Sequence, residues 1–118
     1  MIKILVVDDS EDVLFTLRDQ LECFDFEVRV ARNVEEAFLI YRGDPDIVAL
    51  LTDGRIPQAG AGSALAARLK DAGFQGLTIL ISGAAWEESR AYPFDAVFDK
   101  PLSRKDYRLL LHLLQSLR

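Results

Sequence analysis

The sequence predicts a single α/β domain built on a doubly wound parallel sheet of five strands. Five short runs rich in branched apolar residues alternate with longer amphipathic segments, a pattern typical of successive strand and helix units. Several runs are almost wholly apolar, as expected of strands that are covered on both faces. The chain has 118 residues, of which 50% are apolar, so we expect one domain with one sizeable core over residues 1–118.

The expected strands are Lys3–Val7, Glu27–Ala31, Ile47–Thr52, Leu77–Ile81 and Ala96–Phe98. The first, third and fourth are nearly all apolar, which favours central positions in the sheet. The second and fifth are less apolar, so we expect them at the edges.

The first two expected helices follow Ser10 and Asn33, residue types that cap helix starts by accepting hydrogen bonds from free backbone amides. Asn33 with Glu36 also resembles a capping box. Behind these caps, apolar residues repeat at helical spacing, which predicts that each helix turns one face inward.

The third helix is expected around Ser63–Asp71 and ends before Gly73, which suits a left-handed cap. The fourth is expected to be short or irregular, over Trp86–Ala91, because Pro93 disfavours helical geometry at the residue before it. The exposure of Trp86 is left open, since it could cover a crevice, dock a partner or pack locally.

The last helix is expected over Arg104–Leu117, and a capping box of Ser103 and Asp106 precedes it. A broad leucine face runs along it, and core packing is its main interpretation. The members of this face are Leu109, Leu110, Leu113, Leu114 and Leu117.

Composition argues against several classes of function. The net charge is −5 and no run of Lys or Arg is present, which argues against direct binding of nucleic acid. No apolar stretch is long enough for a membrane span, so we expect a cytoplasmic protein without membrane contact. Cys23 is the only cysteine; it cannot form an internal disulfide and is interpreted as a small packing residue.

Polar side chains occur where the apolar runs stop, and the carboxyl ends of parallel strands meet at one edge of a sheet. They are Asp8, Asp9, Asp53, Ser82 and Lys100. Three carboxylates in one crevice repel one another, and a hard divalent cation with oxygen ligands relieves that repulsion. Magnesium fits best, with manganese as the alternative.

Asp53 is the best candidate nucleophile, because a carboxylate can attack phosphorus to give an acyl phosphate. Lys100 could pair with this carboxylate before the reaction and with a phosphoryl oxygen afterwards. The hydroxyl of Ser82 could donate a hydrogen bond to another oxygen of the group.

Four fragments together resemble the signatures of response-regulator receiver domains, and the resemblance extends over essentially the whole chain. Each fragment alone is weak, but the four occur in the right order and at the right strand ends. They are Val6-Val7-Asp8-Asp9, Asp53-Gly54-Arg55-Ile56-Pro57, Leu80-Ile81-Ser82-Gly83 and Asp99-Lys100-Pro101.

The resemblance implies a flavodoxin-like receiver fold with strand order 2-1-3-4-5. It also implies that Asp53 accepts a phosphoryl group from a histidine kinase or a histidine phosphotransfer protein. Magnesium would be held by Asp9, Asp53 and the carbonyl of Arg55, with Asp8 acting through water. Ser82 and Lys100 would bind the phosphoryl oxygens.

The same resemblance implies a switch that acts on a downstream protein or effector domain, and a homodimer is possible. Such a domain assists its own phosphorylation and dephosphorylation and is not a dedicated enzyme.

Two features depart from the receiver pattern. Receivers usually carry Tyr or Phe three residues before the lysine, where this chain has Val97. Phe98 cannot take over, because adjacent strand residues point to opposite faces. Ser82 and Lys100 are 18 positions apart, fewer than is usual in the family, which agrees with a short fourth helix. We therefore expect a remodelled output surface.

Other functions remain open. The acids could be ordinary solvated loop residues, although their joint placement with Ser82 and Lys100 argues against this. A pseudo-receiver would keep the fold and bind a protein partner without phosphate. A phosphatase would need a second acid–base group, and Asp8-Asp9 would repel the phosphate of a flavin.

Overall fold

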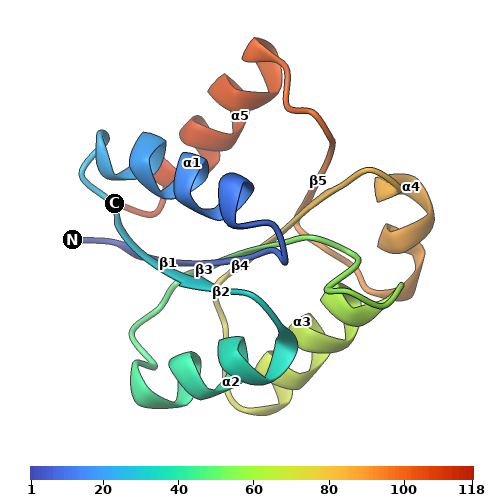
Figure 1. Ribbon diagram of the computed structural model, residues 1–118. Coiled ribbons are helices and arrows are strands. Elements are labelled where there is room, and N and C mark those ends of the chain that lie inside the picture. Colours follow the sequence, from blue (N-terminus) through green and yellow to red (C-terminus); the bar gives the residue numbers. More distant parts are fainter.

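The computed structural model describes residues 1–118 as one five-stranded parallel sheet with helices on both faces (Figure 1). The strand order is β2-β1-β3-β4-β5, which confirms the predicted topology and the edge positions of β2 and β5. The strands are β1 Lys3–Val7, β2 Glu27–Ala31, β3 Ala49–Thr52, β4 Leu77–Ser82 and β5 Ala96–Asp99.

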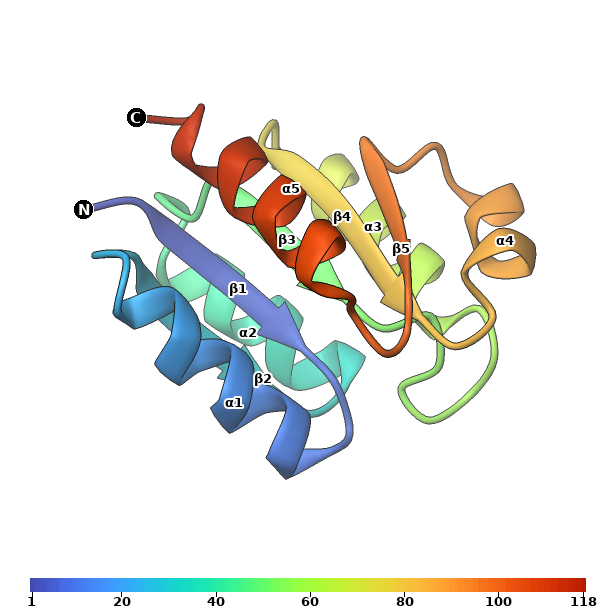
Figure 2. The same cartoon turned by 90° about the horizontal axis from the view of Figure 1, so that it is seen from above.

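Two pairs of helices sandwich the sheet, as both views of the ribbon show (Figures 1 and 2). Helices α1 and α5 cover one face, α2 and α3 cover the other, and the short α4 lies beyond β5. The bounds are α1 Glu11–Glu22, α2 Val34–Gly43, α3 Ala61–Asp71, α4 Ala85–Glu88, the 3-10 turn η1 Ser89–Ala91 and α5 Arg104–Gln115.

Each face of the sheet has its own core, because successive side chains of a strand point to opposite faces. In β1, Ile4 and Val6 are buried under α1 and α5, whereas Leu5 and Val7 are buried under α2 and α3. In β5, Phe98 is buried and Val97 is 40% exposed, as the alternation predicts.

The predicted helix starts are confirmed. Ser10 Oγ accepts a hydrogen bond from the Val13 amide, and Asn33 Oδ1 accepts one from the Glu36 amide. Ser103 and Asp106 form the complete capping box. The C-terminal signal of α3 is also confirmed, since Gly73 has a φ of 105°.

The fourth connection is short, as predicted, with four residues in α4 and three in η1. None of the helices combines the length and the apolar composition that a membrane-spanning helix requires.

Some details of the prediction were wrong. Strand β3 begins at Ala49, because the Ile47 amide still donates to the Asp44 carbonyl in the preceding turn. Leu109 is 50% exposed although it belongs to the leucine face of α5. Cys23 is also exposed; it is the C-cap residue of α1 and is not among the buried residues of that helix. Helical periodicity alone does not show how far around a helix the neighbouring layer extends.

Candidate functional site

The carboxyl ends of four strands bring the predicted polar residues to one edge of the sheet. Asp8 and Asp9 follow β1, Asp53 follows β3, Ser82 ends β4 and Lys100 follows β5. Backbone hydrogen bonds fix these ends against one another. The Asp53 amide donates to the Val7 carbonyl at 3.0 Å, and the Lys100 amide donates to the Ser82 carbonyl at 3.1 Å. The ladders of the sheet therefore position the site.

The ammonium group of Lys100 bridges two carboxylates. Its Nζ lies 2.6 Å from Asp8 Oδ2 and 2.9 Å from Asp53 Oδ2. Asp8 is 3% exposed and the Lys100 side chain is 27% exposed, so this ion pair is partly shielded from water. The other oxygens are also held: Asp8 Oδ1 accepts from the Ser10 amide, and Asp53 Oδ1 accepts from the Arg55 amide. The orientation of both carboxylates is thus set before any ligand binds.

Asp9 completes an acidic cluster with Asp8 and Asp53. One ligand oxygen from each of the three lies within 4.8 Å of the others, and Asp9 is exposed to solvent. Three carboxylate oxygens with one open side suit a hard cation that keeps several waters, as Mg²⁺ does. The donor set therefore fits the divalent ion that the sequence predicts.

Burial and charge shift the pKa values of the paired groups. Burial raises the pKa of Asp8, and the hydrogen bonds from Lys100 and from the Ser10 amide only partly oppose this. Burial lowers the pKa of Lys100, but its hydrogen bonds to Asp53 and Asp8 outweigh that effect, so the pKa is raised. Lys100 therefore carries its charge at neutral pH and screens the repulsion between the two acids.

The remaining predicted residues lie around this cluster. Ser82 is 2% exposed, and its Oγ accepts a hydrogen bond from the Ala84 amide. The guanidinium of Arg55 is exposed, and its Nε lies 3.9 Å from Glu88 Oε1. The roles assigned to Ser82, to the Arg55 carbonyl and to Val97 in a switch stay predictions.

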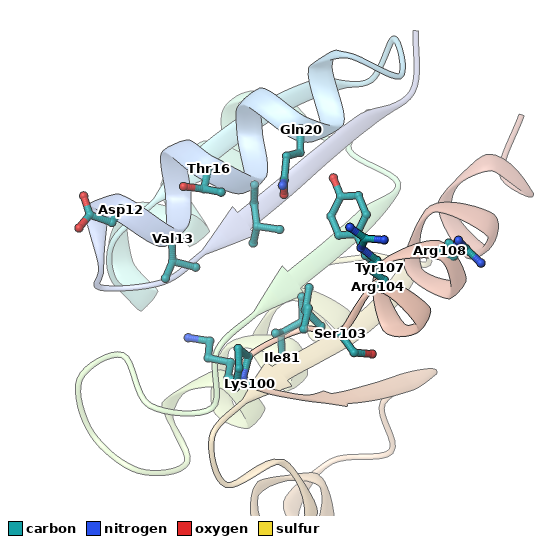
Figure 3. A pocket seen from close by; sticks show the side chains of 13 residues that line it. Asp12, Val13, Thr16, Gln20, Ile81, Lys100, Ser103, Arg104, Tyr107 and Arg108 are labelled. Carbon is teal, nitrogen blue, oxygen red and sulfur yellow. The ribbon is translucent and has the colours of Figure 1, made fainter.

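A groove of about 890 Å³ opens between α1 and α5, on the other side of Lys100 (Figure 3). Val13, Leu17 and Ile81 contribute its apolar lining. Tyr107 reaches into it from α5, and its hydroxyl is the one buried side-chain polar atom without a hydrogen-bond partner. Lys100 borders both this groove and the acidic cluster.

Glu88 lies beside the residue that follows Asp53, which the sequence did not predict. This residue of α4 is 7% exposed, and its carboxylate accepts a hydrogen bond from the Gly60 amide at 3.1 Å. The sequence signal is slight: a glycine, Gly54, directly follows Asp53 and leaves room for the Glu88 side chain. Nothing in the spacing of the two residues shows that they meet.

No protein-family model and no curated protein matches this chain. Several solved structures do match this chain. The non-phosphorylated HemR receiver domain from Leptospira biflexa is 24% identical, with a TM-score of 0.84, covering 100% of this chain and 97% of that one. A CheY-like receiver domain protein from Methanospirillum hungatei JF-1 is 23% identical, with a TM-score of 0.82 and coverage of 98% and 95%.

The response regulator TrrA from Thermotoga maritima, solved in complex with Mg²⁺ and BeF, is 22% identical. Its TM-score is 0.77, and the match covers 97% of this chain and 99% of that one. These likenesses extend over the full sheet and its helices, so the chain has the fold of response-regulator receiver domains.

Proposed function

We propose that this protein is a receiver that accepts a phosphoryl group on Asp53 and thereby switches a protein-interaction surface. The observation that carries this proposal is the bridge from Lys100 Nζ to Asp53 and Asp8, beside the carboxylate of Asp9. A positive charge fixed against a nucleophilic carboxylate is the arrangement that transfer of an anionic group needs.

The reaction conserves atoms and charge in a simple displacement. A carboxylate oxygen of Asp53 attacks phosphorus and forms an O–P bond. The N–P bond of a phosphohistidine donor breaks, and its electron pair stays on the imidazole nitrogen. The donor is a histidine kinase or a histidine phosphotransfer protein, and this exchange takes place in the cytoplasm.

This chain's residues prepare and then hold the product. Lys100 orients Asp53 through the 2.9 Å contact. After the transfer, its ammonium group can pair with a negatively charged phosphoryl oxygen. The Ser82 hydroxyl can exchange its present partner, the Ala84 amide, for another oxygen of that group. Asp53, Asp9 and the Arg55 carbonyl are the proposed Mg²⁺ or Mn²⁺ ligands, with Asp8 acting through water. The bound cation would neutralise charge on the phosphoryl oxygens.

The protein acts in this proposal as a phosphoacceptor that assists its own phosphorylation and dephosphorylation, not as a dedicated enzyme. Its output goes to a downstream protein or effector domain, either as a monomer or as a homodimer.

A phosphate-independent interaction module is the second candidate. Val97 favours it, because this 40% exposed aliphatic residue stands where the resembled family carries the aromatic of its switch. Such a module would keep the fold while its surface stayed constant.

One experiment separates the two functions. The protein is incubated with Mg²⁺ and acetyl phosphate, and its intact mass is measured. We expect an adduct of one phosphoryl group that is absent from Asp53→Asn and absent without Mg²⁺. Asp46→Asn is the matched control, since Asp46 is an exposed acid that precedes β3, at the other end of the sheet. Absence of an adduct on the unaltered protein would favour the interaction module.

A further inference from the structure

Glu88 fastens α4 to the segment that follows Asp53. Its Oε2 accepts a hydrogen bond from the Gly60 amide at 3.1 Å, and its main-chain carbonyl accepts one from Ser63 Oγ at 3.1 Å. Its Oε1 lies 3.9 Å from Arg55 Nε. These partners all belong to the loop after Asp53 or to the first turn of α3, whereas Glu88 is 25 to 33 positions further along the chain.

The stem of Glu88 occupies the space beside the residue that directly follows the phosphoacceptor. A Cβ atom on Gly54 would lie 2.6 Å from Glu88 Cγ and 2.7 Å from Cδ, closer than such atoms approach one another. The Glu88 side chain therefore fits only because residue 54 is a glycine, and we call Gly54 and Glu88 the matched pair. A glutamate with 7% exposure needs such partners, because this residue type is rarely buried without them.

Helix α4 depends on tertiary contacts for its position. It has four residues and no side-chain N-cap, and a 3-10 turn follows it. A helix this short has almost no stability of its own. Glu88 thus connects the loop from Gly54 to Gly60 with an element that has little stability of its own.

We propose that Glu88 couples the phosphorylation state of Asp53 to the position of α4, and so supplies the link that the aromatic at the Val97 position provides in the resembled family. This inference rests on the proposed phosphorylation of Asp53. A phosphoryl group adds negative charge next to Gly54 and Arg55. The Arg55 guanidinium is drawn toward that charge and away from Glu88, the loop shifts, and α4 follows.

The fluorescence of Trp86 can report this movement of α4. Trp86 is the only tryptophan of the chain and lies in α4, two positions before Glu88. Its side chain is 72% exposed, with the Arg90 guanidinium 5.2 Å from the ring centre. A shift of α4 against its surroundings changes the fluorescence of this residue.

The test measures two quantities on each protein after addition of Mg²⁺ and acetyl phosphate: the phosphorylated fraction from intact mass, and the change in Trp86 fluorescence per phosphorylated molecule. We expect Glu88→Ala to accept the phosphoryl group but to lose at least half of the fluorescence change. Glu88→Gln keeps an oxygen acceptor for the Gly60 amide and should retain most of it. Glu87→Ala, which removes an exposed glutamate of the same helix, should behave like the unaltered protein.

A double substitution makes the test specific for the matched pair. Gly54→Ala displaces the Glu88 side chain and should reduce the fluorescence change as Glu88→Ala does. Combining the two should cause no further loss, because the contact is already broken.

Several results would overturn the coupling role. They are a normal fluorescence change in Glu88→Ala, a Glu88→Gln protein no better than Glu88→Ala, additive losses in the double variant, or a phosphorylated unaltered protein whose fluorescence does not change. These results leave phosphorylation of Asp53 standing. Absence of a phosphoryl adduct on the unaltered protein would instead refute the proposed function, and the coupling role with it.

Discussion

The ammonium nitrogen of Lys100 lies 2.9 Å from a carboxylate oxygen of Asp53, although 47 positions separate the two residues in the chain. The same nitrogen is 2.6 Å from Asp8, which is 92 positions away. A parallel sheet makes this possible because every strand delivers its carboxyl end to the same edge. One cation thus holds together the ends of β1, β3 and β5, and this linkage has measurable consequences.

Replacing Lys100 by Met should destabilise the protein in the absence of divalent ions. The substitution keeps the apolar stem but leaves Asp8 and Asp53 without their counter-charge, which costs about 1–3 kcal/mol in the free energy of unfolding. Urea unfolding at neutral pH measures this loss. Saturating Mg²⁺ should recover part of it, and more in this variant than in the unaltered protein, since the ion replaces the missing charge.

Lys105→Met is the control, because Lys105 is an exposed cation on α5 with no carboxylate partner in the site. Phosphorylation of Lys100→Met should persist at a reduced level, with a diminished Trp86 response. Equal stabilities of the Lys100 variant and this control would contradict the role of the bridge.

Mg²⁺ should raise the midpoint of thermal unfolding, and Asp9→Asn should remove most of that gain. A ligand that binds only the folded state stabilises by mass action, by about 2.7 kcal/mol at a free concentration 100 times its Kd. Asp9 is the exposed member of the acidic cluster, so its replacement removes a proposed ligand without exposing the core. Asp12→Asn, another exposed acid nearby, should keep the Mg²⁺ effect. An unchanged response in Asp9→Asn would place the ion elsewhere.

Replacing Tyr107 by Phe should stabilise the protein by about 1 kcal/mol, because a buried hydroxyl without a partner costs free energy that the phenyl ring does not. Tyr41→Phe should be close to neutral. Chemical denaturation at neutral pH gives both values, and a destabilised Tyr107→Phe protein would mean that the hydroxyl has a stabilising partner in solution.

The advantage of Tyr107→Phe should grow at alkaline pH. Burial, and then the neighbouring charge of Cys23, raises the pKa of Tyr107 above its ordinary value of 10.0. The unfolded chain therefore loses this proton first as the pH rises past 10.0, so the unaltered protein loses stability from there up to the folded pKa. Phenylalanine has no such proton. A difference between the two proteins that stays constant across this range would contradict the raised pKa.

Gly62→Ala should destabilise the protein by about 1–3 kcal/mol through overpacking. A Cβ atom on Gly62 would lie 2.0 Å from the carbonyl oxygen of Asp53, and the Gly62 amide donates to the Gly54 carbonyl at 3.1 Å. The first turn of α3 and the loop that follows Asp53 must therefore separate to admit a methyl group. Ala64→Gly, on the exposed side of the same helix, provides a comparison with a helix-propensity cost alone. If Gly62→Ala had the same free energy of unfolding as the unaltered protein, the loop after Asp53 would accommodate the added methyl group without cost.

The sequence by itself determined the features that depend on local chemistry. Apolar runs located β1 and β2 at their observed bounds, and hydroxyl or amide side chains located the starts of α1, α2 and α5. Pro93 and Gly73 marked a short fourth helix and the end of the third. The meeting of Asp8, Asp53 and Lys100 was also predictable, since it follows from strand direction and the position of each residue at a strand end.

Only the tertiary structure decided how side chains share space across elements. The burial of Glu88 depends on an absent Cβ at Gly54, and Leu109 is 50% exposed although it belongs to the same leucine face as the buried Leu110. The hydrophobic periodicity and the secondary-structure propensities of residues describe one element at a time. Side-chain packing depends in addition on the distance and shape of the neighbouring element. The chemistry at the strand ends could therefore be read from the chain, and the route from that chemistry to α4 could not.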